Sequence, residues 1–155
     1  IETLIQFARP YIYTTALPPA IAAATSTSLT LLSKESWRRD NLQQRIAQFR
    51  AGAKRLGLSM VDSTTPIQPV LLGDDALVLN VAAQLKQSYI LVGAIRPPTV
   101  PEGTSRLRIT FSAAHSSQNV EQLLVALDEA IPLSARTRSS PTSMVDAMSN
   151  AVGHD

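Results

Sequence analysis

The chain of 155 residues contains no cysteine and only two histidines. The absence of cysteine excludes a disulfide framework, a thiol nucleophile and a thiolate metal site. Two histidines cannot build a histidine-rich metal site, so no metal ligands are predicted. The sequence also has no Gly-rich phosphate loop, no Ser/His/Asp arrangement and no pair of carboxylates spaced for acid–base chemistry. The pattern alone therefore identifies no catalytic residue.

Lysine is also scarce, with three residues against 11 arginines, and the formal net charge is only +2. Such a small charge does not indicate a nucleic-acid partner, although the pI of about 9.3 makes the positions of the arginines informative. Residues 17–32 form the longest weakly polar run, but prolines and hydroxyl side chains interrupt it, and it is shorter than the ~20 apolar residues of a membrane span. With 45% hydrophobic residues, the chain is predicted to be soluble and globular, without a membrane partner.

The first eight residues contain no initiator Met and no basic segment before an apolar run, so they predict neither a signal peptide nor a natural start. They are typical of the last turns of a helix whose beginning is not in this sequence, and Arg9-Pro10 is predicted to end that helix. Extended structure is predicted over residues 11–15, where aromatic and β-branched residues adjoin. A largely buried helix is predicted over residues 18–32, because two prolines suit its first turn and an Ala-rich stretch follows.

Helices and strands alternate from about residue 36 to residue 131, in an order compatible with helices covering one face of a small sheet. The clearest strand alternates strictly, with Leu107, Ile109 and Phe111 on one side and polar residues on the other. Pro69 predicts an edge position for its strand. The predicted helices cover residues 37–56, 75–85 and 117–131, and the predicted strands cover residues 58–62, 67–72, 90–95 and 106–111.

Basic residues on the first of these helices allow two interpretations. Arg38, Arg39, Arg45 and Arg50 could contact a nucleic acid. The solvated face of an amphipathic helix commonly carries such charges, and the apolar residues of this helix recur at helical spacing on other faces. The spacing favours the solvated face.

Arg96 and Arg108 are the clearest candidates for binding an anion. Three prolines within five positions follow Arg96, and they predict a stiff, extended backbone that fixes the direction of its guanidinium. Arg108 lies on the polar side of the strand over residues 106–111, where its planar donor group could bind a carboxylate through two hydrogen bonds. An arginine on a strand face is also commonly a solvated charge or part of a weak ion pair, so both interpretations stay open.

Thr14 and Thr15 precede a predicted helix start, where hydroxyl and backbone N–H groups can bind a phosphate. Such hydroxyls often satisfy the neighbouring backbone instead, so a structural role is the alternative. His115, between a strand and a helix cap, is predicted to be structural, and Asp74-Asp75 is predicted to cap a helix.

Seven short motifs follow one another along residues 1–131: Phe7-Ala8-Arg9, Tyr13 to Pro19, Arg50-Ala51-Gly52, Ile67-Gln68-Pro69, Ala94 to Pro101, Gly103 to Arg108, and Ala113-Ala114-His115. In combination they resemble the carboxy-terminal part of the α-oxoamine synthases, which are fold type I enzymes that use pyridoxal 5'-phosphate (PLP).

The resemblance implies an α/β fold in three parts. Residues 1–32 would be the end of the large PLP-binding domain and an interdomain helix. Residues 33–132 would be the C-terminal small domain, with helices packed on a short, mainly antiparallel sheet, and residues 133–155 a flexible tail.

The stretch from Ile95 to Pro101 is most similar to the branch of this family that joins L-alanine to a pimeloyl thioester and releases carbon dioxide. The thiol carrier in that branch would be coenzyme A or acyl carrier protein. Glycine-using acetyltransferases and aminolevulinate synthases usually differ at Arg96 and Pro97, and serine palmitoyltransferases tend to differ at Val100. The resemblance thus implies a cytoplasmic step of biotin synthesis.

The resemblance also implies roles for individual residues. Arg108 would bind the carboxylate of the amino acid, Thr99 would contact substrate, and Arg96 would line the entrance for the acyl substrate. Thr14 and Thr15 would reach the PLP phosphate in the neighbouring subunit of a homodimer.

The lysine that carries the cofactor in this family lies upstream of the first matching motif. Lys34, Lys54 and Lys86 are the only lysines, and they fall in predicted helices that match no such position. We therefore expect the chain alone to be inactive and unable to attach PLP covalently. Another α-oxoamine synthase, such as a glycine C-acetyltransferase, and a non-catalytic α/β module that binds anions are the alternatives.

Overall fold

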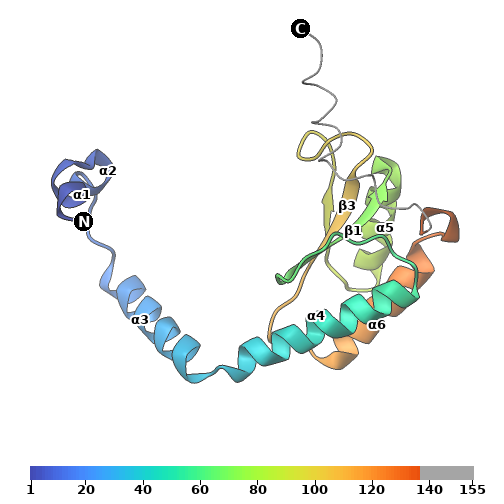
Figure 1. Ribbon diagram of the computed structural model, residues 1–155, viewed down its shortest axis with the longest axis horizontal. Helices are drawn as coiled ribbons and strands as arrows, with labels where there is room; N and C mark the ends of the chain where they lie inside the picture. The colour runs from blue at the N-terminus through green and yellow to red at the C-terminus, as the bar shows by residue number, and fades with distance from the viewer. Residues whose placement is uncertain (137–155) are drawn as a thin grey trace, which may run out of the picture. The chain divides into compact units, whose positions relative to one another are not determined.

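A computed structural model describes residues 1–136 and divides the chain between Trp37 and Arg38 into two compact units (Figure 1). The predicted boundary, between residues 32 and 33, lay slightly earlier. No helix within the described residues is long and apolar enough to cross a membrane.

The first unit contains three helices, α1 (Glu2–Phe7), α2 (Arg9–Ile12) and α3 (Pro19–Lys34). They confirm the helices predicted over residues 1–8 and 18–32, but the extended structure predicted to begin at Tyr11 is wrong for its first residues. Pro10 lies in the first turn of α2, where a helix needs no N–H donor, and the N–H of Tyr13 donates to the Arg9 carbonyl at 3.2 Å. This local turn overrides the β propensity of the aromatic residues.

Helix α3 is exposed along its whole length in this chain, so the prediction that it is largely buried is wrong. The other two helices of the unit are short and have no buried residues. The hydroxyls of Thr25, Thr27, Thr30 and Ser33 donate to backbone carbonyls four residues earlier, at 2.8–3.0 Å. The helix thus satisfies its polar side chains locally and draws on alanine propensity, not on packing within its unit.

The second unit packs three helices against one sheet (Figure 1). The helices are α4 (Trp37–Arg55), α5 (Asp75–Gln87) and α6 (Ser117–Ala130). The strands β1 (Ile67–Gly73), β2 (Gly93–Ile95) and β3 (Ser105–Thr110) are antiparallel, in the order β1-β3-β2. This arrangement confirms the predicted α/β fold with helices on a short antiparallel sheet.

The central strand β3 shows the alternation predicted for it. Leu107, Ile109 and the following Phe111 are buried, whereas Arg108 and Thr110 are exposed. The helices contribute Ile46, Phe49 and Ala53 from α4, Val78, Val81 and Leu85 from α5, and Val120, Leu123 and Leu127 from α6 to the same apolar core. The core therefore lies on one face of the sheet.

Two of the predicted strands are reduced in the structure. The segment over residues 58–62 makes only an isolated bridge to β1, and the strand predicted over residues 90–95 is limited to Gly93–Ile95. Pro69 explains the first difference, because it has no N–H to donate to this segment, although its carbonyl accepts from the Val61 N–H at 3.3 Å. β1 is an edge strand, as Pro69 predicted.

The described chain is folded as far as Arg136. Leu133–Ala135 form a 3-10 turn after α6, and the Arg136 guanidinium donates to the Ile131 carbonyl at 2.7 Å and forms an ion pair with Asp128. The prediction of a flexible tail over residues 133–155 is therefore wrong for residues 133–136. The rest of that range, residues 137–155, lies outside the described residues.

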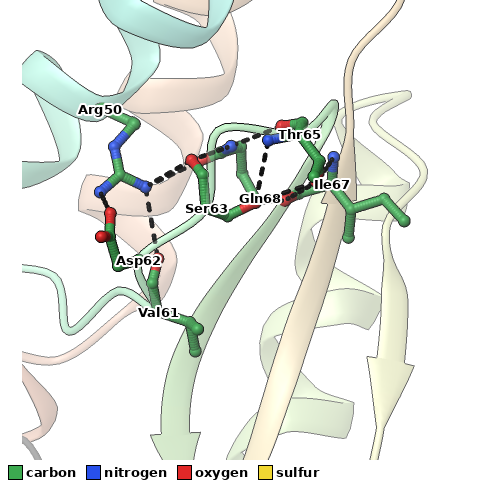
Figure 2. Close-up of polar contacts among 7 residues, drawn as sticks. All are labelled: Arg50, Val61, Asp62, Ser63, Thr65, Ile67 and Gln68. Carbon is green, nitrogen blue, oxygen red and sulfur yellow. Dashed lines mark hydrogen bonds and ion pairs between the residues drawn. The ribbon is translucent and has the colours of Figure 1, made fainter.

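A buried amide joins α4 to the start of β1 (Figure 2). Gln68 is 0% exposed; its Oε1 accepts from Arg50 Nη1 at 3.0 Å, and its Nε2 donates to the carbonyls of Ser63 and Thr65 at 3.1 and 2.7 Å. Arg50 Nη1 also donates to two carbonyls of the loop before β1, at 3.3 and 3.2 Å. Two motifs that are distant in the sequence, around Arg50 and around Gln68, thus meet and fix this loop by satisfying its carbonyls.

We expect Gln68→Leu to lower the free energy of unfolding by about 2 kcal/mol, because the carbonyls of Ser63 and Thr65 and the Arg50 guanidinium each lose a hydrogen-bond partner. Urea denaturation followed by circular dichroism measures the change. Gln87→Leu is the matched control, since Gln87 is exposed at the end of α5 and its replacement should change stability by less than about 0.5 kcal/mol. Equal midpoints for Gln68→Leu and the parent chain would contradict the expectation.

Candidate functional site

The sheet of the second unit has an open face, opposite to the helices. It carries Ile67, Pro69 and Leu71 from β1, Gly93 and Ile95 from β2, and Arg106, Arg108 and Thr110 from β3. Each of these residues is exposed or half-buried. The only charged residues among them are the two arginines, so this face is suited to bind an anion.

Arg108 occupies the middle of the open face, as its place in the strand predicted. In the register of the sheet it lies between Pro69 and Gly93, and a Cβ at Gly93 would lie 3.5 Å from the Cβ of Arg108. The glycine therefore leaves one side of the arginine uncovered. Arg108 is exposed, and its side chain has no hydrogen bond or ion pair with any residue in the described part of the chain. Its planar donor group is thus available for a carboxylate.

Arg96 and Thr99 meet in one turn at the end of β2. The N–H of Thr99 donates to the Arg96 carbonyl at 3.0 Å, and the Pro97–Pro98 peptide bond is cis. The hydrogen bond from Thr99 to Arg96 closes a turn, so the extended path predicted after Arg96 is wrong. Such a turn uses no N–H group of either proline. Both candidate side chains are exposed.

A second turn completes the connection from Arg96 to β3. The N–H and the hydroxyl of Thr104 both donate to the Pro101 carbonyl, at 3.2 and 2.7 Å. Gly103 has a φ of +72°, which favours glycine, so the sequence requirement at this position is conformational. The loop thus joins the two strands that carry Gly93 and Arg108.

Thr14 and Thr15 lie in the first unit, between α2 and α3, and both are exposed. The structure offers fewer backbone donors here than predicted, since Pro18 and Pro19 have no N–H and the N–H groups of Ile21 and Ala22 donate to the Pro18 carbonyl. The Thr14 hydroxyl makes one long contact of 3.5 Å with the Thr15 carbonyl. An anion that binds here would therefore accept hydrogen bonds mainly from the two hydroxyls.

The structure confirms that His115 is structural and that Asp74 caps a helix, whereas Asp75 lies in the first turn of α5 and is not its cap. Nδ1 of His115 accepts from the Ser112 N–H at 3.1 Å, and its ring lies edge-on to Phe111. The Asp74 carboxylate caps α5 by accepting from the Leu77 N–H at 2.7 Å. Asp75 accepts from the buried hydroxyl of Ser105 and so holds the start of α5 to the start of β3.

Two residues with clear structural or electrostatic roles were missed by sequence reasoning. Arg50 belongs to the loop-fixing network described above, so it is not part of a solvated basic face, and this weakens the interpretation of α4 as a nucleic-acid surface. Arg106 shares the open face with Arg108 and was not singled out. The alternation of residues 106–111 was the signal that could have identified it.

A groove of about 890 Å³ lies between α6 and the segment over residues 88–92, and none of the predicted site residues lines it. Within residues 1–136 no group of His, Asp and Glu side chains is arranged to hold a metal ion. The candidate site is therefore the open sheet face with its adjoining loop, and not the groove.

The three lysines do not fit the covalent attachment of PLP. Lys34, Lys54 and Lys86 are exposed on the surfaces of α3, α4 and α5. None of the three is among the described residues that line the groove. The described residues could supply contacts to anionic groups at the periphery of such a cofactor, but they do not form its whole site.

Three comparisons place the chain among known proteins. The sequence model of the family described as aminotransferase class I and II matches residues 1–127. An 8-amino-7-oxononanoate synthase of Ectopseudomonas mendocina strain ymp is 63% identical over 132 residues, which are 85% of this chain and 34% of that relative. The chain thus spans about one third of the length of the curated relatives that it matches.

Solved structures with a similar fold include members of the same group of enzymes. A crystal structure of 8-amino-7-oxononanoate synthase from Francisella tularensis is 32% identical, with a TM-score of 0.73 over 83% of this chain and 37% of that one. A structure of SPT with PLP as the internal aldimine is 27% identical, with a TM-score of 0.78 over 83% of this chain and 33% of that one. The similarity supports a fold type I architecture for the parent of both units.

We expect the 155-residue chain, mixed with an equimolar amount of PLP, to develop no visible absorption band that depends on a lysine, because its three lysines are solvated helix residues. Borohydride reduction followed by mass spectrometry of peptides should find no cofactor on any single lysine in stoichiometric yield. The full-length parent protein is the positive control. Stoichiometric labelling of Lys34, Lys54 or Lys86 would contradict the expectation.

Proposed function

Because the chain belongs to the class I and II aminotransferase family, we propose that it is the carboxy-terminal part of a PLP-dependent C-acyltransferase of the 8-amino-7-oxononanoate synthase type. The proposed reaction joins L-alanine to a pimeloyl thioester and releases carbon dioxide and the thiol carrier, as a step of biotin synthesis in the cytoplasm. The observation that carries the proposal is the 63% identity to a named synthase. PLP would supply the electron sink of this reaction.

The division of the chain supports an assignment of its parts. Residues 1–32 would be the end of the large PLP-binding domain and the interdomain helix, and residues 33–132 the small domain, with residues 133–155 as its tail. The exposed, Ala-rich helix α3 agrees with this assignment, because a linking helix would find its packing partners in the rest of the parent protein. The lysine that holds the cofactor would also lie in that part.

Arg108 would bind the carboxylate of L-alanine. Its side chain starts from the central strand of the sheet, which fixes the position of its Cβ, and the guanidinium has no acceptor among the described residues to give up when the substrate arrives. Gly93 adds no side chain beside the Cβ of the arginine, and a planar guanidinium can donate two hydrogen bonds to one carboxylate. The bound carboxylate would thereby be held in one orientation.

Arg96 and Thr99 would line the entrance for the acyl thioester. Both side chains project from a connection that two hydrogen-bonded turns keep short, and this connection begins at the strand that carries Gly93. The turn holds the two exposed side chains next to each other without a competing ion pair from the described part of the chain. Arg96 suits the phosphates or the polar carrier of a thioester, and Thr99 suits its carbonyl.

Thr14 and Thr15 would contact the PLP phosphate of the neighbouring subunit in a homodimer. Two adjacent hydroxyls can both donate to one phosphate, and neither hydroxyl is tightly bound to the backbone here. A contact across the subunit interface would make the site of each subunit depend on its partner.

Removing the carboxylate contact gives the sharpest test of the reaction. In the full-length enzyme we expect Arg108→Ala to lower kcat/KM for L-alanine by about 100-fold or more, since it removes two charge-assisted hydrogen bonds, and to leave PLP affinity nearly unchanged. Steady-state assays with pimeloyl-CoA and a spectroscopic PLP titration measure the two effects.

The control for Arg108→Ala is Arg55→Ala, because Arg55 is an exposed arginine at the end of α4. Glycine and L-serine in place of L-alanine test the other branches of the family. Unaltered kinetics of Arg108→Ala would refute the assigned role, and turnover of glycine but not of L-alanine would refute the proposed reaction.

The phosphate contact predicts a different pattern. We expect Thr14→Val and Thr15→Val each to weaken PLP binding by about 5- to 10-fold, because one neutral hydrogen-bond donor to a phosphate is lost, with less effect on the KM of L-alanine. Titration of the apoenzyme with PLP gives the dissociation constants. Thr27→Val is the matched control, since its hydroxyl is exposed on α3 and donates to the Ala23 carbonyl. A PLP affinity that none of the three variants alters would contradict the assignment.

A further inference from the structure

Arg106 is the second arginine of the open sheet face, and the roles proposed above do not use it. It precedes Arg108 by two residues on β3, so both side chains stand on the same face. Nε of the half-buried Arg106 donates to the Thr104 carbonyl at 3.0 Å, which fixes the guanidinium. Its terminal amino groups have no hydrogen-bond or ion-pair partner within residues 1–136. An oriented cation with free donors is suited to bind an anionic ligand.

The surroundings of Arg106 differ from those of Arg108. In the register of the sheet, Arg106 lies between Leu71 of β1 and Ile95 of β2, and both aliphatic side chains are half-buried. Arg108 has a proline and a glycine in the corresponding places. A ligand that binds at Arg106 can therefore place methylene groups against two aliphatic side chains and its negative charge against the guanidinium.

The spacing of the two arginines agrees with the length of one substrate. Residues two apart on a strand are separated by about 7 Å. The six carbon–carbon bonds of an extended pimeloyl chain, of about 1.5 Å each, span about 7.5 Å from the thioester carbon to the terminal carboxylate. If Arg108 holds the carboxylate of L-alanine, the thioester carbon must approach the adjacent α-carbon. The other end of the acyl chain then reaches as far as Arg106.

We propose that Arg106 binds the terminal carboxylate of a dicarboxylic acyl thioester and thereby selects it over a monocarboxylic thioester of the same length. This inference rests on the proposed function and adds a residue that determines acyl specificity. The free guanidinium donors, the flanking aliphatic side chains and the spacing to Arg108 each support it.

The test compares two acyl substrates in the full-length enzyme that contains this chain. Pimeloyl-CoA and heptanoyl-CoA have the same number of carbons in the acyl chain, but only the first has a terminal carboxylate. We expect Arg106→Gln to lower kcat/KM for pimeloyl-CoA about 10- to 100-fold, and to leave kcat/KM for heptanoyl-CoA and the KM of L-alanine within about twofold. Arg106→Lys keeps the charge without the planar donor group, so it should lose less.

Arg55→Gln is the matched control, because it removes one exposed positive charge from α4 and should not change the ratio of the two kcat/KM values. If Arg106→Gln does not fold, as judged by circular dichroism, the ratio measured for Arg106→Lys decides. An unchanged ratio, or an equal fall for both thioesters, overturns the role of Arg106. An enzyme that uses neither thioester with L-alanine overturns the proposed function itself, so the two failures are distinguishable.

Coenzyme A also carries phosphates, which Arg106 could bind instead of the acyl carboxylate. Inhibition by free coenzyme A and by pimelate separates these two anions. We expect the inhibition constant of pimelate to rise at least about 10-fold in Arg106→Gln and that of coenzyme A to stay the same. A rise for coenzyme A alone overturns the assignment to the carboxylate.

Discussion

The alternation of β3 is the constraint on which the rest of the structure depends. Leu107 and Ile109 are buried against three helices, and the two-residue period of a strand then directs Arg106 and Arg108 to the opposite face. The same pairing decides what lies beside each arginine, since the register places Gly93 next to Arg108. A shift of one residue would move both charges into the core, where an unpaired charge is strongly destabilising. The apolar side of the strand thus positions its charged side without contacting any ligand.

The parts of the fold that the sequence predicted are those in which local pattern and tertiary packing agree. The capped helices α5 and α6 and the alternating β3 need no distant information, because their apolar residues recur at the period of the element they form. The strand predicted over residues 58–62 is reduced to an isolated bridge, because the neighbouring strand contains Pro69, which has no N–H to donate. Whether α3 is buried could not be read from its composition either, because burial depends on what packs against a helix.

The candidate site was predictable where a strand carries it and less so where a loop does. The place of Arg108 on the polar side of β3 followed from the alternation, but its function rested on a resemblance, since a pattern of spacing cannot distinguish a ligand-binding arginine from a solvated one. The turn that brings Thr99 to Arg96 was not predicted, because several prolines in series are compatible with an extended path as well as with a turn. The contact of Arg50 with Gln68 joins two distant segments, and only the folded chain reveals it.

Three arginines of the second unit show how the surroundings decide what one residue type does. Arg50 donates to three carbonyl oxygens and a carboxylate, so its donors are occupied by the protein and it fixes a loop. The Arg106 side chain has one hydrogen bond, which orients it, and the Arg108 side chain has none in the described part of the chain. Two like charges on neighbouring positions of one face repel each other, and the strand residues described on that face include no carboxylate that would offset the repulsion. Binding of anions at both positions would remove this repulsion, so the open face gains most from a ligand with a negative group at each arginine.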